Sequence, residues 1–242
     1  MRVSPFRRGR VGRFTAELSN LGCLSHPKRA DYYRMIRAVL LIFEPVATWE
    51  KLFRTRPGVG AVFGISFFPL LLAVAALEGY GIKRWGSWQT ELERMKTFPQ
   101  NEAVVVAVVH LLLMTLVCFL ATKVIKSMAD TFHARQTYDQ AFVTVACSML
   151  PLLLFSLLNV FPFVSPWATW SVGIAFTVRA LYHGIPRLMD PDPIHAFGLF
   201  IGSALVIAFA TSLVRFFIYY YVRGSSPLLT DLVYKLCSKL HF

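Results

Sequence analysis

Residues 175–210 read AFTVRALYHGIPRLMDPDPIHAFGLFIGSALVIAFA, two apolar runs on either side of a short polar elbow. The elbow contains two histidines, an arginine, two aspartates and three prolines: His183, His195, Arg187, Asp190, Asp192, Pro186, Pro191 and Pro193. Proline lacks an N–H and clashes with the preceding helical turn, so we expect both flanking helices to stop at the elbow. The stretch therefore predicts a membrane hairpin with a tight, charged turn at one membrane surface.

The composition of the whole chain also indicates a membrane protein. Of its 242 residues, 56% are hydrophobic and 16% are charged, and the mean hydropathy is +0.55. A soluble globular domain carries about 25% charged residues. The formal net charge of +12 would suggest nucleic acid in a soluble protein. Because the basic residues lie next to apolar runs, we expect a lipid bilayer with anionic lipids as the partner, and no nucleic acid.

Five apolar segments are interpreted as transmembrane helices. In chain order they are residues 58–77, 103–125, 138–162, 167–182 and 196–221. About 20 apolar residues form about 30 Å of helix, which is the thickness of the hydrocarbon core. Pro69 predicts a kink in the first span, and the span is expected to end at Glu78. The loop that follows carries Trp85 and Trp88, which are typical of a membrane interface.

The two ends of the chain are not expected to span the membrane. Residues 1–30 predict a basic flexible tail, and residues 31–57 predict two short amphipathic helices in the interface, interrupted at Pro45. Residues 223–242 place leucines on one helical face and predict an interfacial amphipathic helix. The predicted fold is therefore all-α: a five-transmembrane-helix bundle, residues 58–222, with interfacial amphipathic helices at both ends.

The distribution of basic residues predicts the orientation of this bundle. Residues 1–57 carry twelve Lys and Arg residues, whereas the turn after the third predicted span carries none. The positive-inside rule then places the N-terminus in the cytoplasm and the C-terminus outside. The loop after the first span carries four Lys and Arg residues and opposes this assignment.

Three polar side chains inside predicted spans are the intramembrane candidates for a functional role: His110, Arg179 and Arg215. A charge at the bilayer centre costs about 2.5–3.5 kcal/mol on insertion scales, so neither arginine is expected to face lipid at mid-depth. His110 either donates to a carbonyl of a neighbouring helix or serves a proton relay or a metal. Arg179 can extend to the cytoplasmic surface. Arg215 either extends outwards or faces the bundle and meets Asp139, Asn159 or a lipid phosphate.

The elbow also offers a metal hypothesis, which the local sequence disfavours. His183, Asp190, Asp192 and His195 include residue types that bind zinc. However, proline flanks each carboxylate, and aspartate before proline is typical of turns. We therefore expect no metal here, and we interpret Asp192 as the cap of the last span.

The remaining motifs concern packing rather than catalysis. No GxSxG or P-loop pattern occurs, so neither an enzymatic activity nor a cofactor is expected. The four cysteines lack metal-ligand spacing and are expected to be unpaired. Gly198-x-x-x-Gly202 is the clearest helix-contact motif, and it would suit packing inside the bundle or between proteins.

Several short patterns resemble the Yip1 family, particularly its bacterial inner-membrane branch. They are Gln140-Ala141-Phe142 and Pro151 in the third span, the Tyr182-x-Gly184-x-Pro186 turn before a Pro-containing acidic stretch, the Gly-rich last span, and EPVATWEKL before the first. The similarity covers about residues 38–222. It implies five spans, a cytoplasmic N-terminus and no known catalysis. Eukaryotic members of the family are linked to vesicle traffic and to small GTPases of the Rab type.

The preferred hypothesis is a non-enzymatic protein of the bacterial inner membrane that assembles with or organises other membrane proteins, as a scaffold or accessory subunit. The alternative is a small transporter, or an accessory subunit of one, in which His110, Arg179 and Arg215 line a pathway. These hypotheses differ in whether the three side chains converge on a water-filled cavity. A lipid-modifying enzyme would need a polar cluster near one membrane surface, which only the elbow offers.

Overall fold

The computed structural model describes residues 42, 44–89, 94–96, 98–132, 136–161, 163–189, 191–192 and 194–222. All described residues belong to one unit of the chain, Arg37–Phe242. The predicted basic tail and the predicted C-terminal amphipathic helix lie outside the described residues.

The first membrane helix is built from three consecutive pieces. They are α5 (Val59–Val62), the π-helical turn η2 (Phe63–Phe67) and α6 (Phe68–Trp85). Pro69 stands at the start of α6 and cannot donate a backbone hydrogen bond. Just before it, the Phe68 N–H reaches back five residues to the Phe63 carbonyl. A π turn thus accommodates the proline, as such bulges commonly do within helices.

Two features of this helix differ from the sequence prediction. Glu78 does not close the helix, because α6 continues to Trp85. Beyond it, the predicted loop contains a short antiparallel hairpin, β1 (Ser87–Gln89) and β2 (Arg94–Lys96), in which Ser87 lies opposite Lys96. A single carboxylate does not interrupt a helix in lipid, since the backbone there has no better hydrogen-bonding arrangement.

The other long elements follow in chain order. They are α7 (Gln100–Thr131), α8 (Tyr138–Ser156) with the 3₁₀ turn η3 (Leu157–Val160), α9 (Pro166–Leu188) and α10 (Ala196–Val222). A capping box starts α8: the Gln140 N–H donates to the Thr137 hydroxyl, and the Thr137 N–H donates to the Gln140 side chain. All of residues 141–153 in α8 are buried, including Pro151.

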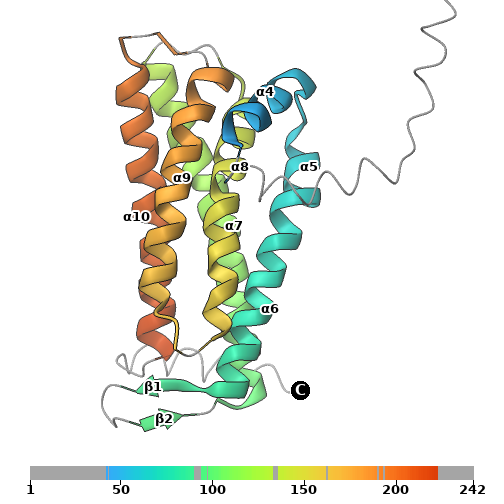
Figure 1. Ribbon diagram of the computed structural model, residues 1–242, viewed down its shortest axis with the longest axis vertical. Helices are drawn as coiled ribbons and strands as arrows, with labels where there is room; N and C mark the ends of the chain where they lie inside the picture. Colours follow the sequence, from blue (N-terminus) through green and yellow to red (C-terminus); the bar gives the residue numbers. More distant parts are fainter. Residues whose placement is uncertain are drawn as a thin grey trace, which may run out of the picture. The chain divides into compact units, whose positions relative to one another are not determined.

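These helices form one bundle around α8 (Figure 1). α8 packs on α9 and α7, while α10 packs on α7 and α9, and α6 packs on α7 and η3. Among the described residues, four helical segments are long and apolar enough to cross a membrane: Val59–Trp85, Gln100–Thr131, Tyr138–Val160 and Ala196–Val222. α9 is not one of the four. The helical membrane class is thus confirmed, with four candidate spans.

A short amphipathic helix, α4 (Pro45–Thr55), lies at the end of the bundle opposite the β1–β2 hairpin (Figure 1). Its Trp49 and Leu52 are buried, and it packs on α9. A Cβ added at Gly184 of α9 would lie 2.7 Å from Trp49 Cζ2, so only glycine admits the indole there. The apolar face of α4 therefore rests on the bundle itself.

The elbow begins later than the sequence predicts. α9 runs through Gly184 and Pro186 to Leu188, instead of stopping at the start of the elbow. Pro186 lies on the exposed side, two residues before the helix ends, so it removes one backbone hydrogen bond without breaking the last turn. The turn proper ends at Asp192, whose carbonyl oxygen accepts the N–H groups of His195 and Ala196, each at 2.9 Å.

Candidate functional site

A group of polar side chains meets between the helices of the bundle. We call these six residues the polar cluster: Glu78, His110, Ser156, Asn159, Thr169 and Arg215. They come from α6, α7, α8, η3, α9 and α10 respectively. Every long helix of the bundle therefore contributes at least one side chain to a single site.

Glu78 is the centre of the cluster because three side chains converge on its carboxylate. Arg215 Nη1 lies 2.8 Å from Oε1, Asn159 Nδ2 lies 2.7 Å from the same oxygen, and His110 Nδ1 contacts Oε2. Glu78, His110 and Arg215 are 6%, 1% and 3% exposed. Removing two charges from water is compensated only when they pair closely and their remaining sites are hydrogen-bonded, and this carboxylate meets both conditions.

Hydrogen bonds extend the cluster from Glu78 to α8 and α9. Arg215 Nη2 donates to Ser156 Oγ at 3.0 Å, and that hydroxyl donates to the Leu152 carbonyl at 2.9 Å. Thr169 Oγ1 donates to Asn159 Oδ1 at 2.6 Å. A continuous chain of hydrogen bonds thus runs from α9 through η3, α6 and α10 to α8. Such a network favours one arrangement of the five helices over others.

The contacts of His110 and Arg215 leave some buried donors and acceptors unused. His110 Nδ1 lies close to Glu78 Oε2 but has no hydrogen-bond partner among the described residues. Of the Arg215 donors, Nη1 and Nη2 are used, whereas buried Nε has no hydrogen-bond partner among the described residues. The Nε–H donor of the guanidinium is therefore open.

Two glycines on α6 allow the close approach that this cluster needs. A Cβ at Gly79 would lie 3.2 Å from the Ala103 carbonyl oxygen on α7, and a Cβ at Gly81 would lie 2.9 Å from the Val160 carbonyl oxygen on η3. Both distances are too short for a larger residue without movement of the backbone. The missing side chains bring Glu78 within reach of its partners on those two elements.

The cluster lies inside the apolar span but closer to the β1–β2 end than to the α4 end. Glu78 is seven residues before Trp85, where α6 ends, and Arg215 is seven residues before Val222, where α10 ends. At 1.5 Å per residue, both side chains start about 10 Å from the helix ends. Ionisable side chains at this depth are rare and mark functional or architectural sites.

The structure brings together two of the three intramembrane candidates. His110 and Arg215 both contact Glu78. Arg215 faces the bundle rather than the surface, and Asn159, one of the partners considered for it, shares Glu78 Oε1 with it. Arg179 lies exposed on α9 and, within the described part of the chain, makes none of the cluster contacts.

Sequence reasoning missed Glu78, Ser156 and Thr169. Glu78 was the first charge after a long apolar run, so it was assigned to the span end. The residues after Glu78, GYGI, carry no charge up to residue 82. This uncharged continuation is the signal that could have placed Glu78 inside the span. Ser156 and Thr169 have no such signal, because small hydroxyl residues are common in membrane helices and often bond only to their own backbone.

The elbow residues are spread over the end of the bundle near α4. Tyr182 is exposed and its ring lies 5.6 Å from that of Phe200, while Gly184 faces Trp49. Asp192 is exposed, and Asp190 lies outside the described residues. Within the described ranges, no group of three His, Cys, Asp or Glu residues is placed to hold a metal ion.

The glycine pair on α10 packs within the chain. A Cβ at Gly198 would lie 3.5 Å from the Phe132 ring, and one at Gly202 would overlap the Met128 methyl group. Met128 belongs to α7 and Phe132 follows its end. The Gly198-x-x-x-Gly202 motif therefore joins α10 to α7.

The fold and the cluster together define a multi-span helical membrane protein whose helices are joined by buried charges. The family model of the Yip1 domain matches residues 39–214, so the chain belongs to the Yip1 family. This is a family of membrane proteins that are not known as enzymes. Neither the curated proteins nor the solved structures contain a match to the chain.

Proposed function

We propose that this chain is a non-enzymatic scaffold or accessory subunit that assembles with or organises other proteins of the bacterial inner membrane. The observation that carries the proposal is the polar cluster. It takes a side chain from every long helix. Hydrogen bonds join five of its members, Glu78, Ser156, Asn159, Thr169 and Arg215, and the sixth, His110, contacts Glu78. Such a centre makes a stable platform, and its outer surface is then free to bind other helices.

The proposed platform has five spans, with α9 as the additional one. α9 has 23 residues, which correspond to about 35 Å of helix. It packs between α8 and α10, both of which are candidate spans. Arg187 is next to the helix end, whereas Arg179 lies nine residues, about 14 Å, before that end and would have to extend its side chain towards it. Five spans, together with the twelve basic residues in residues 1–57, support a cytoplasmic N-terminus and a periplasmic C-terminus.

The outer face of α10 is the best candidate for contact with a partner protein. Its exposed large side chains include four aromatic phenylalanines: Phe197, Phe209, Phe216 and Phe217. The exposed stripe of α7 consists instead of aliphatic residues only: Val104, Val108, Leu112, Leu116, Leu120 and Val124. Lipid tails are satisfied by an aliphatic surface, whereas aromatic rings are enriched where proteins contact one another.

The test combines purification in mild detergent from native membranes with a matched pair of variants. We expect another membrane protein to co-purify at fixed stoichiometry. Phe209→Ala on α10 should lose it, and Leu116→Ala on α7 should keep it, although both side chains are exposed and apolar. A lone monomer or homo-oligomer from native membranes would contradict the scaffold proposal.

A small transporter remains the second candidate, and one observation favours it. The Glu78–His110 contact places a carboxylate and an imidazole inside the membrane, next to an open Arg215 donor. The exposed position of Arg179 weighs against a pathway that includes all three predicted residues. Purified protein in liposomes with an internal pH-sensitive dye would test it. A proton flux through the unchanged protein that is lost in His110→Gln would support transport. The absence of flux in both the unchanged protein and the variant would count against it.

A further inference from the structure

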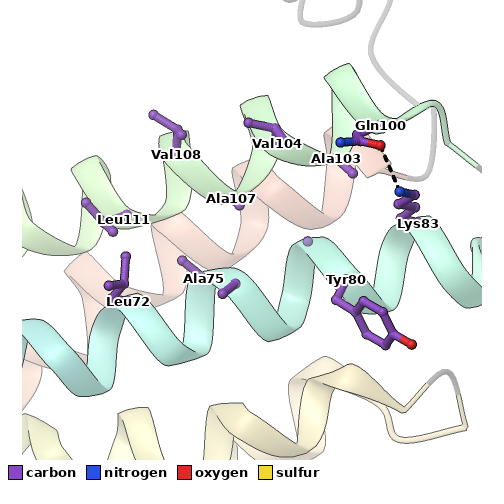
Figure 2. Close-up of a pocket in the computed structure, with 12 residues that line it drawn as sticks. Leu72, Ala75, Tyr80, Lys83, Gln100, Ala103, Val104, Ala107, Val108 and Leu111 are labelled. Carbon is purple, nitrogen blue, oxygen red and sulfur yellow. Dashed lines mark hydrogen bonds between the residues drawn. The ribbon is translucent and has the colours of Figure 1, made fainter.

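A groove runs along the outer surface between α6 and α7, with a volume of about 310 Å³. Small residues line it, among them Ala76, Gly79 and Ala107, together with larger side chains such as Val104 and Val108. Figure 2 shows Val104, Ala107 and Val108 along α7. The same small residues that let α6 approach α7 thus leave a depression on the side of the helix pair that faces away from the bundle. In a membrane, this depression is open to lipid.

The two ends of the groove differ in polarity. At one end Leu72 and Leu111 close it with apolar side chains. At the other end Lys83 Nζ donates to Gln100 Oε1 at 2.8 Å (Figure 2). The apolar end lies partway along α6 and α7, and the polar end lies at the end of α6 and the start of α7.

The length of the groove matches half of a bilayer. Leu72 and Lys83 are eleven residues apart on one helix, which corresponds to about 16 Å at 1.5 Å per residue. The hydrocarbon core is about 30 Å thick, so each leaflet contributes about 15 Å. A chain lying in the groove would therefore run from the membrane surface at Lys83 to the bilayer centre at Leu72.

We propose that this groove binds one acyl chain of an anionic glycerophospholipid whose headgroup phosphate is bound by Lys83. A lysine ammonium has three donors, and the bond to Gln100 uses one, so two remain for phosphate oxygens. The adjacent Arg84 carries its guanidinium over the Trp85 ring, 5.4 Å from the centroid, and adds a second positive charge at the same helix end.

Charge and shape together distinguish this lipid from the bulk bilayer. A tail on a flat helix surface exchanges freely, whereas a tail between two walls loses contacts when it leaves. At the polar end of the groove, the positive charge of Lys83 would hold the phosphate, as basic residues next to a membrane attract anionic lipids. The occupant is thus a whole phospholipid, recognised at both ends, and the site is separate from the polar cluster and from α10.

The test measures lipid retained by the full chain. The protein is placed in nanodiscs with equal amounts of phosphatidylglycerol and phosphatidylcholine, extracted into mild detergent, and examined by native mass spectrometry. We expect one retained phospholipid, with phosphatidylglycerol preferred roughly fivefold over phosphatidylcholine, as expected for one basic side chain at an anionic headgroup.

Two matched pairs of variants separate the chain from the headgroup. Ala76→Phe fills the groove and should lose the lipid, while Ala175→Phe, on an exposed position of α9, should retain it. Lys83→Gln should keep a lipid but lose the headgroup preference, while Lys123→Gln, exposed on α7, should keep both. If Ala76→Phe does not assemble, Val104→Trp, at an exposed residue that lines the groove, takes its place.

The opposite results overturn the proposal. Equal lipid retention by Ala76→Phe and Ala175→Phe would show that the groove does not hold the chain. An unchanged preference in Lys83→Gln would show that another group reads the headgroup. Displacement of the lipid by inorganic phosphate alone would assign Lys83 to a free anion instead of a phospholipid.

Discussion

Replacement of Arg215 by methionine should strongly destabilise the bundle. The substitution keeps a long side chain between the helices but removes the bonds to Glu78 Oε1 and Ser156 Oγ. Glu78 would keep its contacts with Asn159 and His110. Its carboxylate would nevertheless remain buried without the arginine that balances its charge.

The size of the effect follows from the burial of the pair. Breaking a buried ion pair by removing one partner costs about 3–5 kcal/mol, because the remaining charge is left uncompensated in a low-dielectric site. Folded proteins are stable by only about 5–15 kcal/mol in total, so the variant should lose a large part of its stability. Since both side chains are nine-tenths buried, salt should hardly change this loss.

The measurement is the free energy of unfolding in detergent micelles, followed by circular dichroism during denaturant titration. Arg179→Met provides the control, because that side chain is exposed on α9. It should shift stability by less than about 0.5 kcal/mol. Glu78→Gln should cost about as much as Arg215→Met, and the double variant should cost less than the sum by at least about 0.5 kcal/mol. Equal losses for Arg215→Met and Arg179→Met, or strict additivity in the double variant, would refute the pairing argument.

Three further predictions address other parts of the chain. Gly81→Ala should lower the free energy of unfolding by about 1–3 kcal/mol, because its Cβ would meet the backbone of η3, whereas Gly60→Ala, with open space around it, should be neutral or slightly stabilising in the same titration. Gly184→Ala should displace the Trp49 indole of α4, so that limited proteolysis cleaves α4 more readily than in the unchanged protein. Gly60→Ala should leave α4 as protected as it is in the unchanged protein. In intact cells, with the native cysteines replaced by serine, a membrane-impermeant maleimide should label Asn101→Cys but not Arg56→Cys, and the reverse pattern would invert the proposed orientation.

The helices of this fold could be predicted largely from hydropathy, because a membrane span needs only a long apolar run. The predicted last span, residues 196–221, differs from α10 (Ala196–Val222) by one residue, and α8 begins at the predicted Tyr138. The predicted helix ends were wrong where a single charged residue or proline was taken to end a helix. Glu78 and Pro186 both lie inside helices that continue beyond them, since helical hydrogen bonding in lipid tolerates isolated exceptions.

The site could be predicted only in part. His110 and Arg215 stood out because each is a lone polar residue in an apolar span, and such residues rarely face lipid. Their common partner did not, because Glu78 and Arg215 are separated by 137 positions in the sequence and only the packing of α6 against the bundle brings them together. The small residues that make this packing possible, Gly79 and Gly81, give no sign in one sequence of which helix they face.

The position of the polar cluster explains how this small membrane protein can hold its helices together and still keep its outer faces available for binding. Apolar helices in lipid have little hydrophobic reason to prefer each other over lipid tails, so their association needs close packing and hydrogen bonds. In this chain α8 supplies the packing, and Glu78 accepts hydrogen bonds from η3 and α10 while it contacts His110 of α7. Because the cohesion is concentrated inside, the outer faces of α10 and of the α6–α7 pair are not needed to hold the fold. Substitutions on those two faces can therefore change binding of a protein or a lipid while the bundle stays intact, which is the condition that the proposed binding experiments require.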